Sequence, residues 1–217
     1  MSGLKAVLFD NDGTLADSRD LILASFRHTG PVVLGRQFSD AEYLQKVGQP
    51  LAVQVRDFTD DPQLQERFCE VYRAHNQTVH DQMIKVFPGT NEALAKFAAA
   101  GLKLGVVTSK RHAVAWHGLE VVGAAPYLDC CVGWDDIERP KPDPQPVERG
   151  CDLLGFAPDE CLYVGDAPFD IQAGNAAGVK TAAVTWGMFD EACLIAESPT
   201  FVAHTWDELV EGVSSLR

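Results

Sequence analysis

Short apolar runs alternate with longer amphipathic segments along most of the chain. The first run, residues 6–9 (AVLF), is uniformly apolar, as expected of a buried strand. The amphipathic segments carry helix signals, because a glycine directly follows each of them and two begin with proline. This repeated order of strand and helix predicts a parallel sheet with right-handed crossovers. The later apolar runs are residues 103–108, 130–132, 162–164, 181–184 and, more weakly, 201–203, and the amphipathic segments are residues 90–100, 144–154 and 168–177.

Residues 17–83 interrupt this alternation. They are helix-like throughout and contain no convincing strand, and residues 63–83 place apolar side chains at helical spacing. Such helices could simply pack on the sheet, but a separate lid is the preferred interpretation. The sequence therefore predicts an α/β fold with a Rossmann-like parallel sheet core, helices on both faces and an inserted all-helical cap domain. Residues 1–16 and 84–217 form the predicted core, and residues 17–83 form the predicted cap.

The composition restricts the partners and the compartment. The 217 residues are 46% hydrophobic, and their net charge of −13 argues against nucleic acid or an anionic membrane as a partner. No apolar run reaches the roughly 18 residues that a membrane span needs, and the N-terminus does not resemble a signal peptide. The cysteines form no C-x-x-C motif, which favours small core residues in a cytoplasmic protein over zinc ligands or disulfides. Both a monomer and a dimer fit these features.

Polar and charged residues recur where the predicted strands end. Asp10 and Asp12 directly follow the first strand, although Asp12-Gly13 by itself would favour an ordinary turn. In a parallel sheet, however, these loops all emerge at one edge, where open α/β sheets bind their ligands. A purely structural explanation is difficult when every such loop carries a polar group. The residues of this kind in the later loops are Thr108, Ser109, Lys110, Lys141, Asp166 and Asp170.

The order of these residues resembles the haloacid dehalogenase superfamily, in its phosphatase branch with a helical cap inserted after the first strand. Asn11 departs from the family pattern, since relatives usually carry an apolar residue there, but the family uses only the backbone of that position. Relatives that dehalogenate lack the second acid, so the presence of Asp12 favours phosphoryl transfer. The matching motifs, in chain order, are Asp10-Asn11-Asp12-Gly13-Thr14, Thr108 with Ser109, Lys141, and Gly165-Asp166 with Asp170.

The resemblance implies a Mg²⁺-dependent phosphohydrolase that acts through an aspartyl-phosphate on a small, anionic, phosphorylated substrate. Asp10 would attack the phosphorus atom, Asp12 would protonate the leaving oxygen and then deprotonate water, and Lys141 would neutralise charge. Two carboxylates about 4 Å apart repel each other by about 4 kcal/mol at an effective dielectric constant of about 20, and a divalent cation relieves this repulsion. The implied metal ligands are Asp10, Asp166 and the backbone carbonyl of Asp12, with Asp170 beside them. The implied phosphate-binding residues are Asn11, Thr108, Ser109 and Lys141.

Substrate choice in such enzymes depends on the cap. Three stretches, residues 25–30 (SFRHTG), 47–51 (VGQPL) and 72–81 (YRAHNQTVHD), are similar to a pyrophosphatase subgroup that is close to phosphoglycolate phosphatases. Pyrophosphate and 2-phosphoglycolate are therefore the favoured substrates, and the resemblance tilts the choice towards pyrophosphate. The residues expected to contact the part of the substrate that leaves are Gln49, His28, Arg27 and Lys110.

The histidines form no convincing metal site within any one predicted helix. His75 falls on the apolar stripe of its helix, which favours a core histidine over a substrate contact. His75 and His80 are five residues apart, as are His112 and His117, and this spacing turns two side chains about 140° from each other on a helix. Such pairs are poor metal ligands.

Two other classes of function also fit the motifs. A phosphosugar mutase uses the same pair of aspartates but returns the phosphoryl group to the sugar, so label would move between sugar positions without release of phosphate. A non-catalytic binding protein could be built on a former enzyme fold. The intact set of Asp10, Asp12, Lys141 and Asp166 argues against the second interpretation.

Overall fold

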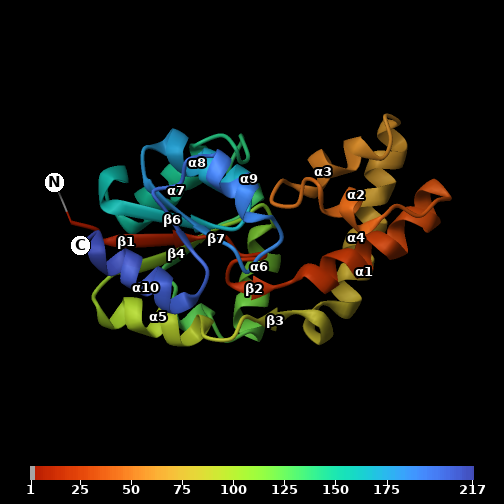
Figure 1. Ribbon diagram of the computed structural model, residues 1–217. Helices are drawn as coiled ribbons and strands as arrows, with labels where there is room; N and C mark the ends of the chain where they lie inside the picture. Colours follow the sequence, from red (N-terminus) through yellow and green to blue (C-terminus); the bar gives the residue numbers. More distant parts are fainter. Residues whose placement is uncertain (1–2) are drawn as a thin grey trace.

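The centre of the molecule is a parallel sheet. The computed structural model describes residues 3–217, and within them the six-stranded sheet has the order β5-β4-β1-β6-β7-β8 (Figure 1). The chain adds strands first on one side of β1 and then on the other, so the loops after β1, β4 and β6 meet at one edge. Every strand of this sheet lies where the apolar runs predict it. The bounds are β1 Ala6–Phe9, β4 Lys103–Val107, β5 Cys130–Val132, β6 Cys161–Gly165, β7 Lys180–Val184 and β8 Phe201–Ala203.

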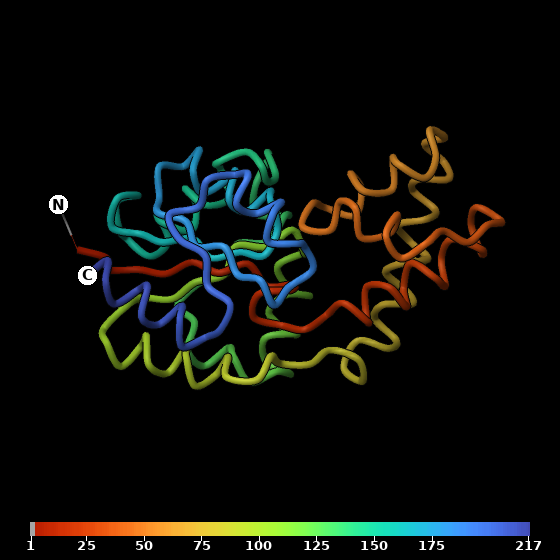
Figure 2. Tube along the Cα trace, in the orientation of Figure 1, coloured from red at the N-terminus to blue at the C-terminus, as the bar shows by residue number. Residues whose placement is uncertain are grey.

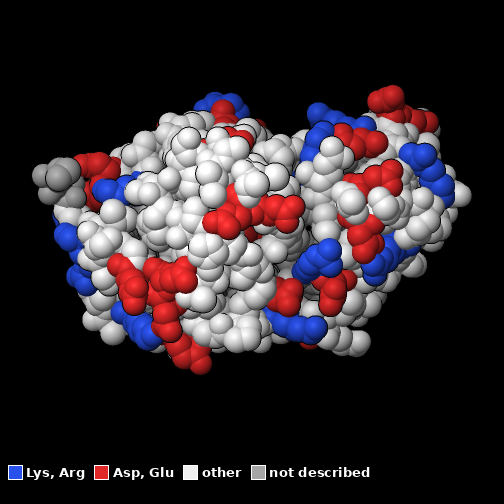
Figure 3. All heavy atoms as spheres, viewed as in Figure 1, with Lys and Arg blue, Asp and Glu red and all other residues white. Residues whose placement is uncertain are grey.

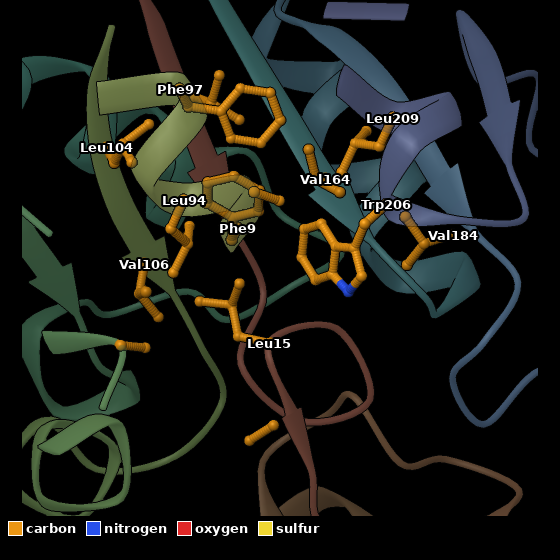
Figure 4. Packing of buried hydrophobic residues seen from close by; sticks show 14 of the residues in the cluster. Phe9, Leu15, Leu94, Phe97, Leu104, Val106, Val164, Val184, Trp206 and Leu209 are labelled. Carbon is orange, nitrogen blue, oxygen red and sulfur yellow. The ribbon is translucent and has the colours of Figure 1, made fainter. Parts of the chain in front are cut away.

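Side chains of β1 alternate between two hydrophobic clusters, one on each face of the sheet. Val7 and Phe9 belong to the larger cluster, where the Phe9 ring lies 6.5 Å from that of Trp206, and Ala6 and Leu8 belong to the other (Figure 4). Burial of a side chain such as Phe9 contributes about 2 kcal/mol to folding. The helices on the first face are α5 Thr90–Ala99, α6 His112–Val121 and α10 Trp206–Ser215, those on the second are α7 Gln145–Leu154 and α8 Pro168–Ala177, and the short α9 is Glu191–Ala196.

Residues 17–83, here called the cap, are almost entirely helical and lie to one side of the sheet (Figure 2). They have a hydrophobic cluster of their own around Phe26, whose ring lies 5.0 Å from Tyr43 and 4.8 Å from Tyr72. The longest helix begins after Asp61, whose carboxylate accepts hydrogen bonds from the first free N–H groups. The elements are α1 Arg19–Thr29, a π-helical turn Gly30–Leu34, α2 Asp40–Leu44, α3 Leu51–Gln54, a 3₁₀ turn Val55–Asp57 and α4 Pro62–Met83.

A small antiparallel ribbon joins the cap to the rest of the chain. In it β2 (Ala16–Asp17) pairs with β3 (Lys85–Val86), and the prediction that residues 17–83 contain no strand is wrong at Asp17. Two residues are too short to show a periodic pattern. Short 3₁₀ turns also occur outside the cap, at Ala125–Tyr127, Trp134–Asp136 and Pro158–Glu160.

Two expectations from composition can be compared with the fold. Each of the six cysteines, all of which lie in the described part of the chain, is a free thiol. Among the helices within residues 3–217, none combines the length and the apolar character that crossing a bilayer requires. Acidic side chains are spread over both lobes on the face shown in Figure 3, in keeping with the net charge of −13.

Candidate active site

The loop after β1 brings Asp10 to the edge of the sheet and folds back tightly. The backbone N–H of Asp10 still donates to Val164 of β6 at 2.8 Å, so its position is fixed by the sheet. Gly13 has φ of +87°, and a Cβ atom there would lie 2.2 Å from the Asp166 carboxylate, so only glycine fits. Thr14 then donates its hydroxyl to Oδ1 of Asp166 at 3.0 Å. The turn thus joins the ends of β1 and β6.

Lys141 is buried beside Asp10 and uses all three of its ammonium protons. It donates to Oδ1 of Asp10 at 2.8 Å, to Oδ1 of Asp170 at 2.6 Å and to the hydroxyl oxygen of Tyr163 at 3.1 Å. These partners come from the loop after β1, from the first turn of α8 and from β6, and the ammonium group is almost fully shielded from solvent. Lys141 is therefore held in one position and neutralises part of the negative charge at the sheet edge.

The electrostatics of the cluster show that one lysine does not balance it. Burial is the main cause that raises the pKa of Asp10 to about 7; Lys141 opposes the shift, and Asp170 and Asp12 add to it. Burial, and then the charges of Asp10 and Asp170, raise the pKa of Asp166 well above its usual range. Burial disfavours the charged form of Lys141, but Asp10 and Asp170 outweigh it, so the pKa of Lys141 lies above its ordinary value. A further positive charge would therefore stabilise the ionised carboxylates of this cluster.

The arrangement of the carboxylates fits a hard divalent cation. Asp10, Asp166 and Asp170 are all buried, and each offers an oxygen within 4.8 Å of the other two. Both oxygens of Asp170 already accept hydrogen bonds, Oδ1 from Lys141 and Oδ2 from the backbone N–H of Ala167. Both oxygens of Asp166 also accept hydrogen bonds, but from neutral donors, the Thr14 hydroxyl and the backbone N–H of Met188, so no ammonium group beside Asp166 opposes a cation. Asp166 and Asp10 could therefore ligate directly, with Asp170 holding Lys141 beside them. Hard divalent cations prefer oxygen ligands of this kind.

A cavity of about 690 Å³ opens above this cluster, between the cap and the core. Thr108, which follows β4, lines this cavity. Its hydroxyl oxygen accepts a hydrogen bond from the backbone N–H of Lys110 at 3.2 Å. Lys110 in turn donates to Oδ1 of Asp12 at 2.6 Å, and Ser18 donates to the same oxygen. Ser109, predicted to bind phosphate, donates its hydroxyl to the carbonyl of Gly48 at 2.6 Å and so ties the core to a cap loop.

The residues predicted to contact the leaving part of the substrate divide into two groups. Gln49 and Lys110 line the cavity. Arg27 and His28 are not among the residues that line it: Arg27 forms an exposed ion pair with Asp40 at 2.6 Å, and the His28 ring stacks at 4.2 Å on that of His75. The prediction for Arg27 and His28 is therefore not supported by their positions.

Two arginines outside the predicted set of site residues also line the cavity. Arg73 comes from α4, and Arg111 directly follows Lys110 at the start of α6. Arg73 lies within the cap stretch 72–81 that carries the family resemblance, and Arg111 continues the polar run after β4. These two positions in the sequence are the only local indications of a site role for Arg73 and Arg111. Neither indicates the direction in which the side chain points.

The comparison with known proteins agrees with this geometry. Residues 7–184 match the family model described as haloacid dehalogenase-like hydrolase. The chain belongs to this family. It is 37% identical over 207 residues to the putative pyrophosphatase PpaX of Caldanaerobacter subterraneus, covering 95% of this chain and 93% of that protein. It is also 33% identical over 208 residues to the pyrophosphatase PpaX of Halalkalibacterium halodurans, covering 96% of each.

Solved structures of haloacid dehalogenase-like proteins share the fold. A putative haloacid dehalogenase-like hydrolase from Bacteroides fragilis has a TM-score of 0.89 and 26% identity, over 95% of this chain and 99% of that one. A predicted phosphatase from Clostridium acetobutylicum has a TM-score of 0.90 and 24% identity, over 99% and 100%. The predictions of the family, of an α/β fold with a parallel sheet core and of a phosphatase enzyme are confirmed.

Asn11 shows what departure from the family pattern costs. Its side chain is fully buried, and neither its amide nitrogen nor its amide oxygen finds a partner among residues 3–217. Its backbone carbonyl accepts hydrogen bonds from the N–H groups of Leu15 and Ala16 and so shapes the turn after β1. Because an unsatisfied buried polar group destabilises a fold, we expect the Asn11 side chain to lower the stability of the folded protein.

Proposed function

We propose that this protein is a Mg²⁺-dependent phosphohydrolase that cleaves pyrophosphate by way of an aspartyl-phosphate on Asp10. The observation that carries the proposal is that Asp10 lines the cavity, with Oδ1 held by Lys141 and with a second acid, Asp12, on the same loop and in the same lining. The names of the relatives, pyrophosphatase PpaX, support the choice of substrate.

The acidic cluster supports a role for Mg²⁺. Asp10 and Asp166 would hold the cation with the backbone carbonyl of Asp12, as the family resemblance implies, and Asp170 would keep Lys141 in place beside them. The cation, when bound, supplies positive charge against the carboxylates and the phosphoryl oxygens. The raised pKa values of Asp10 and Asp166, which burial causes first and their mutual repulsion next, indicate that this charge is missing from the side chains alone.

In the first step, Asp10 attacks phosphorus with the carboxylate oxygen that Lys141 does not hold. A bond forms between Oδ2 of Asp10 and phosphorus, and the bond between phosphorus and the bridging oxygen breaks. Asp12 donates a proton to the leaving phosphate. Oδ1 of Asp12 accepts from Lys110 and Ser18, which leaves Oδ2 as the atom that carries the transferred proton. Thr108 accepts from the N–H of Lys110, so its own hydroxyl proton is available to a phosphoryl oxygen.

In the second step, water attacks the phosphorus atom of the aspartyl-phosphate. Asp12, now ionised, takes the proton from that water, and the bond between phosphorus and Oδ2 of Asp10 breaks. The products are a second phosphate ion and the original carboxylate of Asp10. Lys141 stays on Oδ1 of Asp10 throughout and offsets the charge that returns to the carboxylate.

The cavity lining also supports a second candidate, 2-phosphoglycolate. Lys110 and Gln49 are scattered donors that suit a second tetrahedral phosphate. Arg73 and Arg111 could instead bind a planar carboxylate through paired N–H groups, which is the arrangement that a guanidinium favours. Because guanidinium groups bind phosphate equally well, these two arginines fit both substrates, and the relatives' names support placing pyrophosphate first.

The free thiols bear on the compartment. Cys130 and Cys131 are adjacent and both remain thiols, as do Cys151 and Cys161, which contact each other across α7 and β6. Disulfides are rare where glutathione keeps thiols reduced. The free thiols support our proposal that the enzyme is cytoplasmic.

A substrate panel tests the proposed function. Release of phosphate should be measured with Mg²⁺ and either pyrophosphate, 2-phosphoglycolate, a sugar phosphate or an aryl phosphate. We expect kcat/KM for pyrophosphate to be at least comparable to that for 2-phosphoglycolate and far above that for the sugar phosphate. Hydrolysis of 2-phosphoglycolate without hydrolysis of pyrophosphate would reverse the order, and transfer between sugar positions without release of phosphate would favour a mutase.

The variant Gln49→Ala sharpens the test, because Gln49 lines the cavity but lies outside the acidic cluster. It should lower kcat/KM for the preferred substrate and spare the aryl phosphate, whose leaving group offers no polar contact. The matched control is Arg27→Ala, which removes a charged cap residue that does not line the cavity.

A further inference from the structure

A cluster of two histidines and one aspartate joins the cap to the core, outside the acidic cluster. Oδ1 of Asp81 lies 2.7 Å from Nδ1 of His80, its neighbour at the end of α4, and 2.8 Å from Nε2 of His117 on α6. The rings of His80 and His117 are 5.5 Å apart. The histidine pairs within each helix are poorly oriented, but this pair between the helices is close.

The donor atoms of the cluster suit a transition metal. Two imidazole nitrogens and one carboxylate oxygen lie within 4.8 Å of one another. Ligands of a tetrahedral zinc ion, at about 2.0–2.1 Å from the metal, are about 3.4 Å apart, so each histidine nitrogen needs to move only slightly away from the Asp81 oxygen that it now contacts. Imidazole favours Zn²⁺ over Mg²⁺, which prefers oxygen ligands. The chain therefore offers a nitrogen-rich site and an all-oxygen site for two different metals.

The surroundings allow the small rearrangement that a metal needs. The side chains of Asp81 and His117 are 57% and 53% exposed, so both can move, whereas His80 is buried and fixed. All three residues line the catalytic cavity.

We propose that His80, Asp81 and His117 bind a zinc ion that ties α4 of the cap to α6 of the core beside the catalytic cavity. Three protein ligands leave the fourth position of a tetrahedral ion open, towards water or an anion in the cavity. The ion links an element of each lobe, so its binding holds the cap in the position seen here (Figure 1). This inference goes beyond the hydrolytic reaction and does not depend on the identity of the substrate.

Calorimetric titration with Zn²⁺ tests the proposal. The protein should be untagged, should carry Cys193→Ser to remove its exposed thiol, and should be held in excess Mg²⁺ to occupy the acidic cluster. We expect one equivalent of Zn²⁺ to bind. Affinity should fall at least tenfold in His117→Ala and in Asp81→Asn, both at exposed positions that the fold tolerates. It should not change in His112→Ala, the matched control on the same helix, which pairs with Asp136 instead.

The variant Asp166→Asn separates the two metal sites. It should retain the zinc site, because Asp166 belongs only to the acidic cluster. The proposal is overturned if wild-type protein binds no Zn²⁺, if His117→Ala binds it as tightly as wild type, or if Asp166→Asn abolishes binding. Hydrogen exchange tests the tie between the lobes: Zn²⁺ should slow exchange at the end of α4 and in α6 together, and protection of α6 alone would contradict it.

Discussion

The ammonium nitrogen of Lys141 lies 2.8 Å from Oδ1 of Asp10, although 131 positions separate the two residues in the chain. The same nitrogen lies 2.6 Å from Oδ1 of Asp170. One side chain thus links the loop after β1, the loop before α7 and the first turn of α8. Stability and the proposed chemistry depend on the same contact.

Replacing Lys141 should destabilise the metal-free protein. In Lys141→Ala the carboxylates of Asp10 and Asp170 lose a buried partner, and breaking a buried pair in this way costs about 3–5 kcal/mol. Tyr163→Phe is the control, because it removes one hydroxyl from the same cluster and should cost about 1 kcal/mol. Urea denaturation in EDTA measures both, and equal effects of the two variants would show that the charge of Lys141 is unimportant.

The stability of the metal-free protein should fall as the pH rises from about 4 to about 7. Asp10 has its pKa raised by burial from 3.8 to about 7, so in this range the folded state keeps a proton that the unfolded chain releases. Asp166 shifts in the same direction, also mainly by burial. Melting curves in EDTA at several pH values test this. A stability that rises across the same range would contradict the assignment of Asp10 and Asp166.

Mg²⁺ should reverse that loss. The cation binds ionised carboxylates, so it competes with the proton at low pH and not at high pH. The increase in melting temperature caused by Mg²⁺ should therefore be larger at about pH 8 than at about pH 5. Asp166→Asn is the control that should abolish the increase, since Asp166 is one of the three clustered carboxylates.

Asn11→Leu should stabilise the protein. The two side chains have nearly the same shape, and leucine removes a buried amide that has no partner among residues 3–217. The expected gain is about 1–3 kcal/mol, the cost of leaving such a group unsatisfied. The backbone carbonyl of Asn11, which accepts from Leu15 and Ala16, is unchanged. A loss of stability in urea denaturation would mean that the amide of Asn11 is bonded after all.

Asp12→Ala should affect substrates unequally. Without Asp12 no acid protonates the leaving oxygen, and general acid catalysis of this kind contributes about 10²–10⁴-fold to a rate. Formation of the aspartyl-phosphate should therefore slow greatly with an alkyl phosphate and little with an activated aryl phosphate, whose leaving group needs no proton. Burst kinetics separate this step from the later attack of water. Equal slowing of the first step for both esters would contradict the role of Asp12.

The fold was largely predictable, because its strands are continuous apolar runs that end at turn residues. The strands at residues 103–107 and 130–132 are where the pattern predicts them. The ribbon between Asp17 and Lys85 was not predictable, since its two strands have two residues each and depend on a pairing across the whole cap. Local patterns carry no information about such distant pairings.

The core of the candidate site was easier to predict than its rim. Asp10 and Lys141 follow strands whose order fixes which loops meet. In contrast, the rotation of a cap helix about its own axis depends on tertiary packing, so Arg27 could not be told from Arg73 by sequence alone. The two histidines of α4 illustrate the same limit. His75 was predicted to lie in the core, but it is only partly buried and its ring stacks on that of His28. His80 is the buried histidine of this helix.

The most direct test of the account is whether phosphate becomes attached to Asp10. Asp12→Ala protein, in which attack by water is slowed, should be mixed with ³²P-labelled pyrophosphate and Mg²⁺, quenched in acid within milliseconds to seconds, and digested. We expect label on the peptide that contains Asp10, and no label and no turnover when Asp10→Ala is introduced into either background. Hydrolysis of pyrophosphate by the Asp10→Ala protein at the wild-type rate would contradict the account.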